Sequence, residues 1–233
     1  MHEPGSLLAS GRDADIFEYG PTTVLRRSRK GRSLANEAHV MTYARAAGYP
    51  VPAVEEISDD GTDLVMERVT GPSMLSVLGR RPWSLDGNGA ILADLHLRLH
   101  DIAAPDGVGA GPGQPGDRLL HLDLHPLNVL LSPRGPVVID WTNACRGVGA
   151  TDVALTWVLM MSAAIPAGRL AAAVLGRARS LFVRRFVGHF DREAVAAELA
   201  SVVAWKVHDP HMSAAEQAAM WRLAASEGAA AQP

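Results

Sequence analysis

The chain has 233 residues, which is enough for one large domain or two smaller lobes. Its net charge of −3 at pH 7 argues against a nucleic-acid-binding protein, because such proteins carry a basic excess. The single cysteine, Cys145, excludes an internal disulfide framework and is typical of a reducing compartment. The apolar stretch 153–164 is too short to cross a bilayer, and no secretory signal is visible at the N-terminus. We therefore expect a cytoplasmic protein that does not bind membranes.

Short apolar stretches separated by turn residues predict an antiparallel sheet in the first part of the chain. The interruptions are Gly11, Gly20-Pro21 and Asp59-Asp60-Gly61. A helix should lie between the third and fourth strands, from its N-cap Ser33 to Ala47. The expected strands are 7–10, 15–19, 22–26, 53–58 and 62–67.

The rest of the chain is predicted to be mainly helical. Asp191 should cap one helix, Ser213 and Glu216 should form a capping box at another, and Thr151-Asp152 should cap the apolar helix that follows. The stretch 105–116 is rich in Gly and Pro, which predicts a flexible surface loop. The expected helices are 73–79, 85–100, 153–164, 167–189, 192–205 and 214–225.

The most informative stretch is His121–Trp141, with the sequence HLDLHPLNVLLSPRGPVVIDW. Two apolar runs flank Pro133-Arg134-Gly135, which predicts a β-hairpin. Asn128 precedes the first strand of this hairpin and Asp140 ends the second. Because a hairpin folds back on itself, Asn128 and Asp140 should lie side by side, with Asp123 one loop away.

These three side chains have the chemistry that phosphoryl transfer requires. Mg²⁺ prefers oxygen ligands, which the amide of Asn128 and the carboxylate of Asp140 can supply. Asp123 can accept the proton of an attacking hydroxyl. The spacing from His121 to Asp123 and Asn128, followed by Asp140, matches the kinase signature H-R-D-x-x-x-x-N and its downstream metal-binding Asp. The alternative, a chance hairpin with solvated carboxylates at its ends, is disfavoured by the number of correctly spaced residues.

The motifs HLDLHPLN and VVIDW resemble those of the aminoglycoside phosphotransferase and choline kinase family, a branch of the protein-kinase-like fold. In this branch a His and a Pro follow the catalytic Asp, as His125 and Pro126 do here. An aromatic residue follows the metal-binding Asp, as Trp141 does here. The resemblance is most specific over 119–152 and extends more loosely back to Leu7.

The resemblance implies a two-lobed α+β fold. A small antiparallel β lobe with one helix, residues 1–70, would bind the nucleotide. A mainly helical lobe, residues 71–233, would carry catalysis and the acceptor site. The hinge between them would be 66–71, where Glu67 and Val69 would lie beside the adenine.

The resemblance also assigns residues of the N-terminal lobe to the nucleotide. Val24 would contact the adenine, and Arg26 would reach the α- and β-phosphates from the position where the family has a lysine. Arginine keeps the positive charge but is larger and forked. This departure is therefore expected to affect the rate of phosphoryl transfer more than the binding of the nucleotide. Glu37 stands where the family has the carboxylate that holds the lysine, and its alternative is a solvated helix Glu. The turn 10–14 would cover the phosphates, although its single glycine fits an ordinary hairpin turn equally well.

The expected activity is transfer of the γ-phosphate of ATP or GTP to a hydroxyl of a small molecule, with Mg²⁺ and Asp123 as the general base. No long segment ending in A-P-E follows Asp140, which favours a small-molecule acceptor over a protein. Acidic and basic residues are balanced in the last helices, so the sequence does not favour an aminoglycoside over another alcohol. The alternative is a nucleotide-binding pseudokinase with a regulatory role, which Arg26 and the single-glycine turn would suit.

A third hypothesis is a zinc site at His96 and His100, which lie at i, i+4 spacing on a predicted helix. The HExxH signature needs a Glu beside the first His, and Leu97 stands there instead. A structural role beneath the catalytic loop is therefore the favoured interpretation of both histidines. The acceptor, the choice between ATP and GTP, and the oligomeric state are left open.

Overall fold

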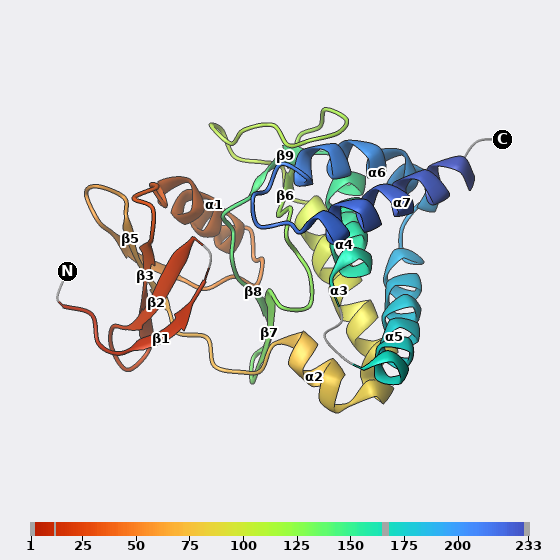
Figure 1. The fold of residues 1–233 in the computed structure, drawn as a ribbon. Helices are drawn as coiled ribbons and strands as arrows, with labels where there is room; N and C mark the ends of the chain where they lie inside the picture. Colours follow the sequence, from red (N-terminus) through yellow and green to blue (C-terminus); the bar gives the residue numbers. More distant parts are fainter. Residues whose placement is uncertain (1–2, 12, 165–167, 231–233) are drawn as a thin grey trace. The chain divides into compact units, whose positions relative to one another are not determined.

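A computed structural model describes residues 3–11, 13–164 and 168–230 (Figure 1). The chain divides into two compact units. The N-terminal unit comprises residues 1–72 and 129–144, and the C-terminal unit comprises residues 73–128 and 145–233. The segment 129–144 therefore belongs with the N-terminal sheet, although more than fifty residues of the other unit separate them in the sequence.

The N-terminal unit contains a five-stranded antiparallel sheet with the order β1-β2-β3-β5-β4 (Figure 1). Its strands are β1 (Leu7–Ser10), β2 (Ala14–Glu18), β3 (Thr23–Ser28), β4 (Val54–Ile57) and β5 (Asp63–Glu67), so the five predicted strands are confirmed to within two residues. Leu25 of β3 and Val65 of β5 pair in register, and they pack with Tyr19 and Phe17 in a small hydrophobic cluster.

Helix α1 (Ala35–Ala46) follows β3, and its N-cap lies one residue later than predicted. Ser33 is not its N-cap, although its Oγ accepts a hydrogen bond from the N–H of Ala35. Leu34 takes that position because its side chain is buried and its N–H donates to the carbonyl of Gly61 at 2.7 Å. The anchoring of Leu34 overrides the usual preference for a polar cap.

The predicted hairpin is present as β7 (Val129–Ser132) and β8 (Gly135–Val138). Its register pairs Val129 with Val138 at its open end, and Asp140 follows the second strand two residues later. Two backbone hydrogen bonds attach the hairpin to its unit, from Leu131 to the carbonyl of Pro72 and from Val138 to that of Pro50.

The C-terminal unit is built mainly from helices, as predicted (Figure 1). Helix α4 lies at its centre, and the side chains from Thr151 to Val158 are all buried. None of the helices in the described part of the chain is long and apolar enough to span a membrane. The elements are α2 (Met74–Arg80), the short 3₁₀ helix η1 (Pro82–Ser84), α3 (Leu85–His100), β6 (Arg118–Leu120), β9 (Cys145–Gly147), α4 (Gly149–Ser162), α5 (Arg169–Val187), α6 (Arg192–Lys206) and α7 (Ala214–Ala230).

In the C-terminal unit the helix caps agree with the sequence patterns at two of three places. Asp191 accepts hydrogen bonds from the first turn of α6, and Ser213 and Glu216 form the predicted capping box before α7. Thr151 and Asp152 do not cap α4, because this helix already begins at Gly149. Both residues point instead to neighbouring segments, and Asp152 has a part in the site described below.

The stretch 105–116 has no helix or strand, but its contacts indicate an anchored loop, contrary to the flexible one expected. Gly111 donates its N–H to the carbonyl of Arg146, and Gln114 donates its N–H to the carboxylate of Glu198 at 3.1 Å. Gly113 has a φ of +84°, and its Cα lies so close to Glu198 that a Cβ there would clash with the carboxylate. The glycines of this loop therefore permit close packing, in addition to conferring backbone freedom.

Candidate active site

Asp123 lies in the loop that follows β6, with 21% of its side chain exposed. One carboxylate oxygen, Oδ2, accepts a hydrogen bond from Nδ2 of Asn128 at 3.0 Å. The other, Oδ1, lies 3.3 Å from Nε2 of His125. The N–H of Leu127 donates to Nδ1 of the same imidazole, so the proton of a neutral His125 is on Nε2 and points to Asp123. Both oxygens of Asp123 are thus held by neighbours in its own loop.

These neighbours set the charge of Asp123. Burial alone would raise the pKa of this carboxyl, but the hydrogen bond from His125 and the positive potential of His125, His121 and Lys206 outweigh burial and lower the pKa. Asp123 is therefore ionised at neutral pH, which is the form that a general base needs. Lys206, at the end of α6, was not singled out from the sequence.

Asn128 is oriented so that its amide oxygen is free. Both hydrogens of Nδ2 are used, one by the carbonyl of Asp123 at 2.9 Å and one by its carboxylate. This assignment turns Oδ1 away from Asp123, and no described residue donates a hydrogen bond to Oδ1. A free carbonyl oxygen is a suitable ligand for Mg²⁺.

Asp152 fixes the backbone immediately before Asp123. Its buried carboxylate accepts hydrogen bonds from the N–H groups of His121 at 3.0 Å and Leu122 at 2.8 Å, and lies 3.3 Å from Nε2 of His100. Burial would raise the pKa of Asp152, but the His100 hydrogen bond and the neighbouring imidazoles and N–H groups lower it well below the usual range. Leu122 has a φ of +54°, a strained conformation that such contacts must hold. Asp152 thereby ties the start of α4 to the loop that holds Asp123.

Arg26 in β3 is the centre of a second group of contacts, in the N-terminal unit. Its Nε lies 3.3 Å from Oε2 of Glu37, which confirms the predicted pair, although the N–H does not point along this line and makes no aligned hydrogen bond. Its Nη2 donates to Oδ1 of Asp140 at 3.0 Å and to Oγ1 of Thr142 at 2.8 Å. The contacts with Asp140 and Thr142 were not predicted from the sequence.

Glu37 is buried, with 4% of its side chain exposed. Burial raises the pKa of this carboxyl, the positive charge of Arg26 opposes the rise, and the negative charge of Asp140 adds to it. The alternative of a solvated helix Glu is therefore wrong. One guanidinium therefore faces two carboxyl groups, those of Glu37 and Asp140.

The remaining predicted nucleotide contacts lie along β3 and after β5. Val24 is buried two residues before Arg26 on the same strand. The carboxylate of Glu67 accepts from the N–H of Ala53 and pairs with Arg134 at 2.5 Å, so this side chain has a structural role. The N–H of Val69 has no hydrogen-bond partner among the described residues and can donate to a ligand.

The zinc hypothesis is not supported by the surroundings of the two histidines. His96 is fully buried, with Nδ1 2.9 Å from the carbonyl of Leu92 and Nε2 3.2 Å from the hydroxyl of Thr156, which in turn donates to the carbonyl of Leu124. His100 faces Asp152. Within the described ranges no cluster of three or more His, Cys, Asp or Glu side chains could hold a metal. These contacts give both histidines a structural role beside the loop that holds Asp123.

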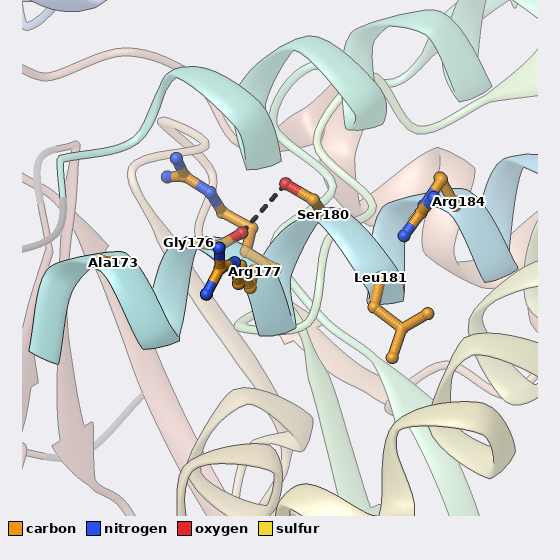
Figure 2. A pocket seen from close by; sticks show the side chains of 7 residues that line it. Ala173, Gly176, Arg177, Ser180, Leu181 and Arg184 are labelled. Carbon is orange, nitrogen blue, oxygen red and sulfur yellow. Dashed lines mark hydrogen bonds between the residues drawn. The ribbon is translucent and has the colours of Figure 1, made fainter.

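An open groove of about 580 Å³ runs along α5 (Figure 2). Three arginine side chains contribute to its lining, and Ser180 donates to the carbonyl of Gly176 within it. It contains none of the predicted site residues, so it adds no candidate to the phosphotransfer site. Its lining residues are Ala173, Gly176, Arg177, Arg179, Ser180, Leu181 and Arg184.

Comparison with known families finds a match for the middle part of the chain. Residues 110–197, which include Asp123, Asn128 and Asp140, match the family described as phosphotransferase enzyme family. The predicted family resemblance is confirmed. No curated protein matches this chain.

Solved structures that resemble this chain include two aminoglycoside phosphotransferases. A thermostable mutant of APH(4)-Ia, in a ternary complex with AMP-PNP and hygromycin B, shares 15% identity over 97% of this chain and 89% of its own, with a TM-score of 0.59. ADP-bound APH(2'')-Ib shares 14% identity over 99% of this chain and 93% of its own, with a TM-score of 0.60. A choline/ethanolamine kinase family protein from Mesorhizobium loti shares 14% identity over 98% of this chain and 87% of its own, with a TM-score of 0.52. At these identities the likeness establishes the fold, which is the predicted kinase-like fold.

Proposed function

We propose that the protein transfers the γ-phosphate of ATP or GTP to a hydroxyl of a small molecule. Asp123 is the general base, and Asn128 and Asp140 are the ligands of Mg²⁺. The observation that carries the proposal is the state of Asp123: an ionised carboxylate, held at both oxygens by His125 and Asn128, within the segment that matches the phosphotransferase family.

The donor atoms suit Mg²⁺. Oδ1 of Asn128 and Oδ2 of Asp140 receive no hydrogen bond from any described residue, and Mg²⁺ commonly takes one or two protein oxygens together with waters and substrate phosphates. When bound, the ion would neutralise the charge of the phosphate oxygens.

Arg26 is proposed to hold the phosphates. Glu37 and Asp140 engage Nε and Nη2, whereas no described residue accepts a hydrogen bond from Nη1. The two N–H groups of Nη1 are available for phosphate oxygens, so the guanidinium can replace the family lysine while keeping its contact with Glu37. Val24 and the N–H of Val69 would contact the adenine, with Glu67 supporting the adjoining strand.

In the reaction, the acceptor oxygen attacks the γ-phosphorus and its proton passes to Asp123. The new O–P bond forms as the bond between the γ-phosphorus and the bridging oxygen breaks, and the nucleoside diphosphate leaves. The hydrogen bonds from His125 and Asn128 occupy one lone pair on each oxygen of Asp123, so a lone pair is left for the proton. General-base assistance of this kind contributes roughly 10²- to 10⁴-fold to the rate.

A screen with γ-labelled ATP and GTP tests the proposal. Purified protein and Mg²⁺ are incubated with hydroxylated metabolites and antibiotics; the latter are included because the APH(4)-Ia relative binds hygromycin B. We expect labelled product with at least one acceptor and slow hydrolysis of the nucleotide without it. Tight binding of Mg–ATP with no turnover on any acceptor would favour the pseudokinase, and a failure to bind either nucleotide would contradict both functions.

A further inference from the structure

The Thr142 hydroxyl lies between the metal-binding and the phosphate-binding side chains of the N-terminal unit. Its Oγ1 is 2.8 Å from Nη2 of Arg26, 2.9 Å from Oδ1 of Asp140 and 3.4 Å from Oε2 of Glu37. Arg26 and Asp140 are themselves 3.0 Å apart, so Nη2, Oδ1 and Oγ1 form a nearly equilateral triangle. Thr142 stands where the DFG motif of protein kinases has a glycine, and glycine cannot make these contacts.

The direction of each hydrogen bond in this triangle follows from the atoms. A guanidinium can only donate, so the hydroxyl accepts from Arg26. The single proton of the hydroxyl must then go to a carboxylate, and Asp140 at 2.9 Å is the better acceptor than Glu37 at 3.4 Å. Oδ1 of Asp140 therefore receives two hydrogen bonds, and Oδ2 receives none from the described residues.

The backbone of Asp140 makes this support more important. Asp140 has a φ of +66°, in the left-handed region, which costs a non-glycine residue about 1 kcal/mol or more. Its side chain is 40% exposed, so burial alone does not fix its rotamer. The contacts with Arg26 and Thr142 hold the carboxylate by one oxygen and leave the other free.

We propose that Thr142 is a positioning residue for the metal-binding carboxylate of Asp140. Its hydroxyl fixes Oδ1 against Arg26 and presents Oδ2 to Mg²⁺. The inference rests on the proposed function, because it takes Asp140 as a metal ligand. It adds a residue that neither the kinase signature nor the family resemblance assigned.

The test measures metal binding and does not depend on turnover. Mn²⁺ replaces Mg²⁺ and is titrated into the complex of the protein with AMP-PNP, with free Mn²⁺ followed by electron paramagnetic resonance. Thr142→Val removes the hydroxyl and keeps the shape; loss of such a supporting contact typically weakens metal binding by about 10- to 100-fold. We expect a loss of at least about tenfold in Mn²⁺ affinity and restoration by Thr142→Ser to within about twofold of wild type.

Thr42→Val is the matched control. Thr42 is in α1 of the same unit, and its hydroxyl donates to the carbonyl of Ala38 inside the helix, with no link to Asp140. This variant should bind Mn²⁺ as wild type does. Thr142→Ala replaces the Val variant if thermal melting shows that the latter does not fold.

The outcomes separate the two proposals. If the wild type binds Mn²⁺ and AMP-PNP but Thr142→Val binds Mn²⁺ equally well, the positioning role is wrong and the proposed function stands. If Thr142→Ser is as weak as the Val variant, the methyl group and not the hydroxyl matters, which also overturns the role. If the wild type binds no Mn²⁺ with AMP-PNP, both proposals fail.

Discussion

Arg26 and Asp140 are 114 residues apart in the sequence, and they form an ion pair with 3.0 Å between Nη2 and Oδ1. The same guanidinium lies against Glu37, which is almost fully buried. Removing one partner of a buried ion pair is costly, because the other charge is left without compensation. Arg26 is therefore expected to matter for stability as well as for nucleotide binding.

Arg26→Gln should lower the free energy of unfolding by about 3 kcal/mol, the usual cost of breaking a buried pair. Urea denaturation followed by circular dichroism measures this loss. Arg27→Gln is the control on the same strand, since Arg27 pairs with Asp63 but 45% of its side chain is exposed. That change should cost less than about 1 kcal/mol. Equal losses in the two variants would show that the Arg26–Glu37 contact has no special weight.

Local patterns predicted much of this architecture. The two apolar runs around Pro133-Arg134-Gly135 predicted a short hairpin, and β7 and β8 pair in the antiparallel register of such a hairpin. The kinase signature identified Asp123 and Asn128 by spacing alone, and the structure places their side chains in contact. In each case the residues are close in the sequence, so the chain itself limits their arrangement.

The contacts that could not be predicted join distant segments. Thr142 lies 105 residues from Glu37, and no periodicity or motif marks a threonine for that contact. The pairing of β6 with β9 was missed because strands of three residues carry almost no alternation. The start of α1 was misplaced because a tertiary bond from Leu34 to Gly61 replaced the expected Ser33 cap.

The anchored loop before β6 gives a second prediction. Gly113 and Gly107 both have a φ of +84°, but a Cβ at Gly113 would meet the carboxylate of Glu198, whereas a Cβ at Gly107 would meet nothing within 4 Å. Gly107→Ala should cost about 1 to 2 kcal/mol from backbone strain alone. Gly113→Ala should cost clearly more, because it also displaces Glu198 from Gln114 and Thr151. Thermal or urea unfolding of both variants measures the difference, and equal stabilities would indicate a loop that is not anchored there.

Buried His96 should make stability depend on pH. Burial lowers its pKa from 6.5 to about 4; the charge of Asp152 opposes this, and His100 and His121 add to it. Between these values the unfolded chain binds the proton more readily, so stability falls as pH drops below 6.5 and levels off below about 4. From pH 7 to pH 5 the expected loss from this group is about 2 kcal/mol.

Urea midpoints at pH 7 and pH 5 measure this dependence. The lowered pKa of Asp152 affects stability only below its ordinary value of 3.8, so it does not contribute in this interval. His96→Asn should remove most of the loss, whereas His39→Asn, at an exposed position on α1, should leave it in place. If His96→Asn retained the full pH dependence, another group would be responsible.

The most direct test of the phosphotransferase account is the turnover of Asp123→Asn with the best acceptor from the labelled-phosphate screen. Asparagine keeps the shape of the side chain but cannot take the proton of the acceptor hydroxyl. The account predicts a fall in kcat of roughly 10²- to 10⁴-fold with little change in the affinity for Mg–ATP. Phosphorylation of the acceptor by Asp123→Asn at the wild-type rate would contradict it.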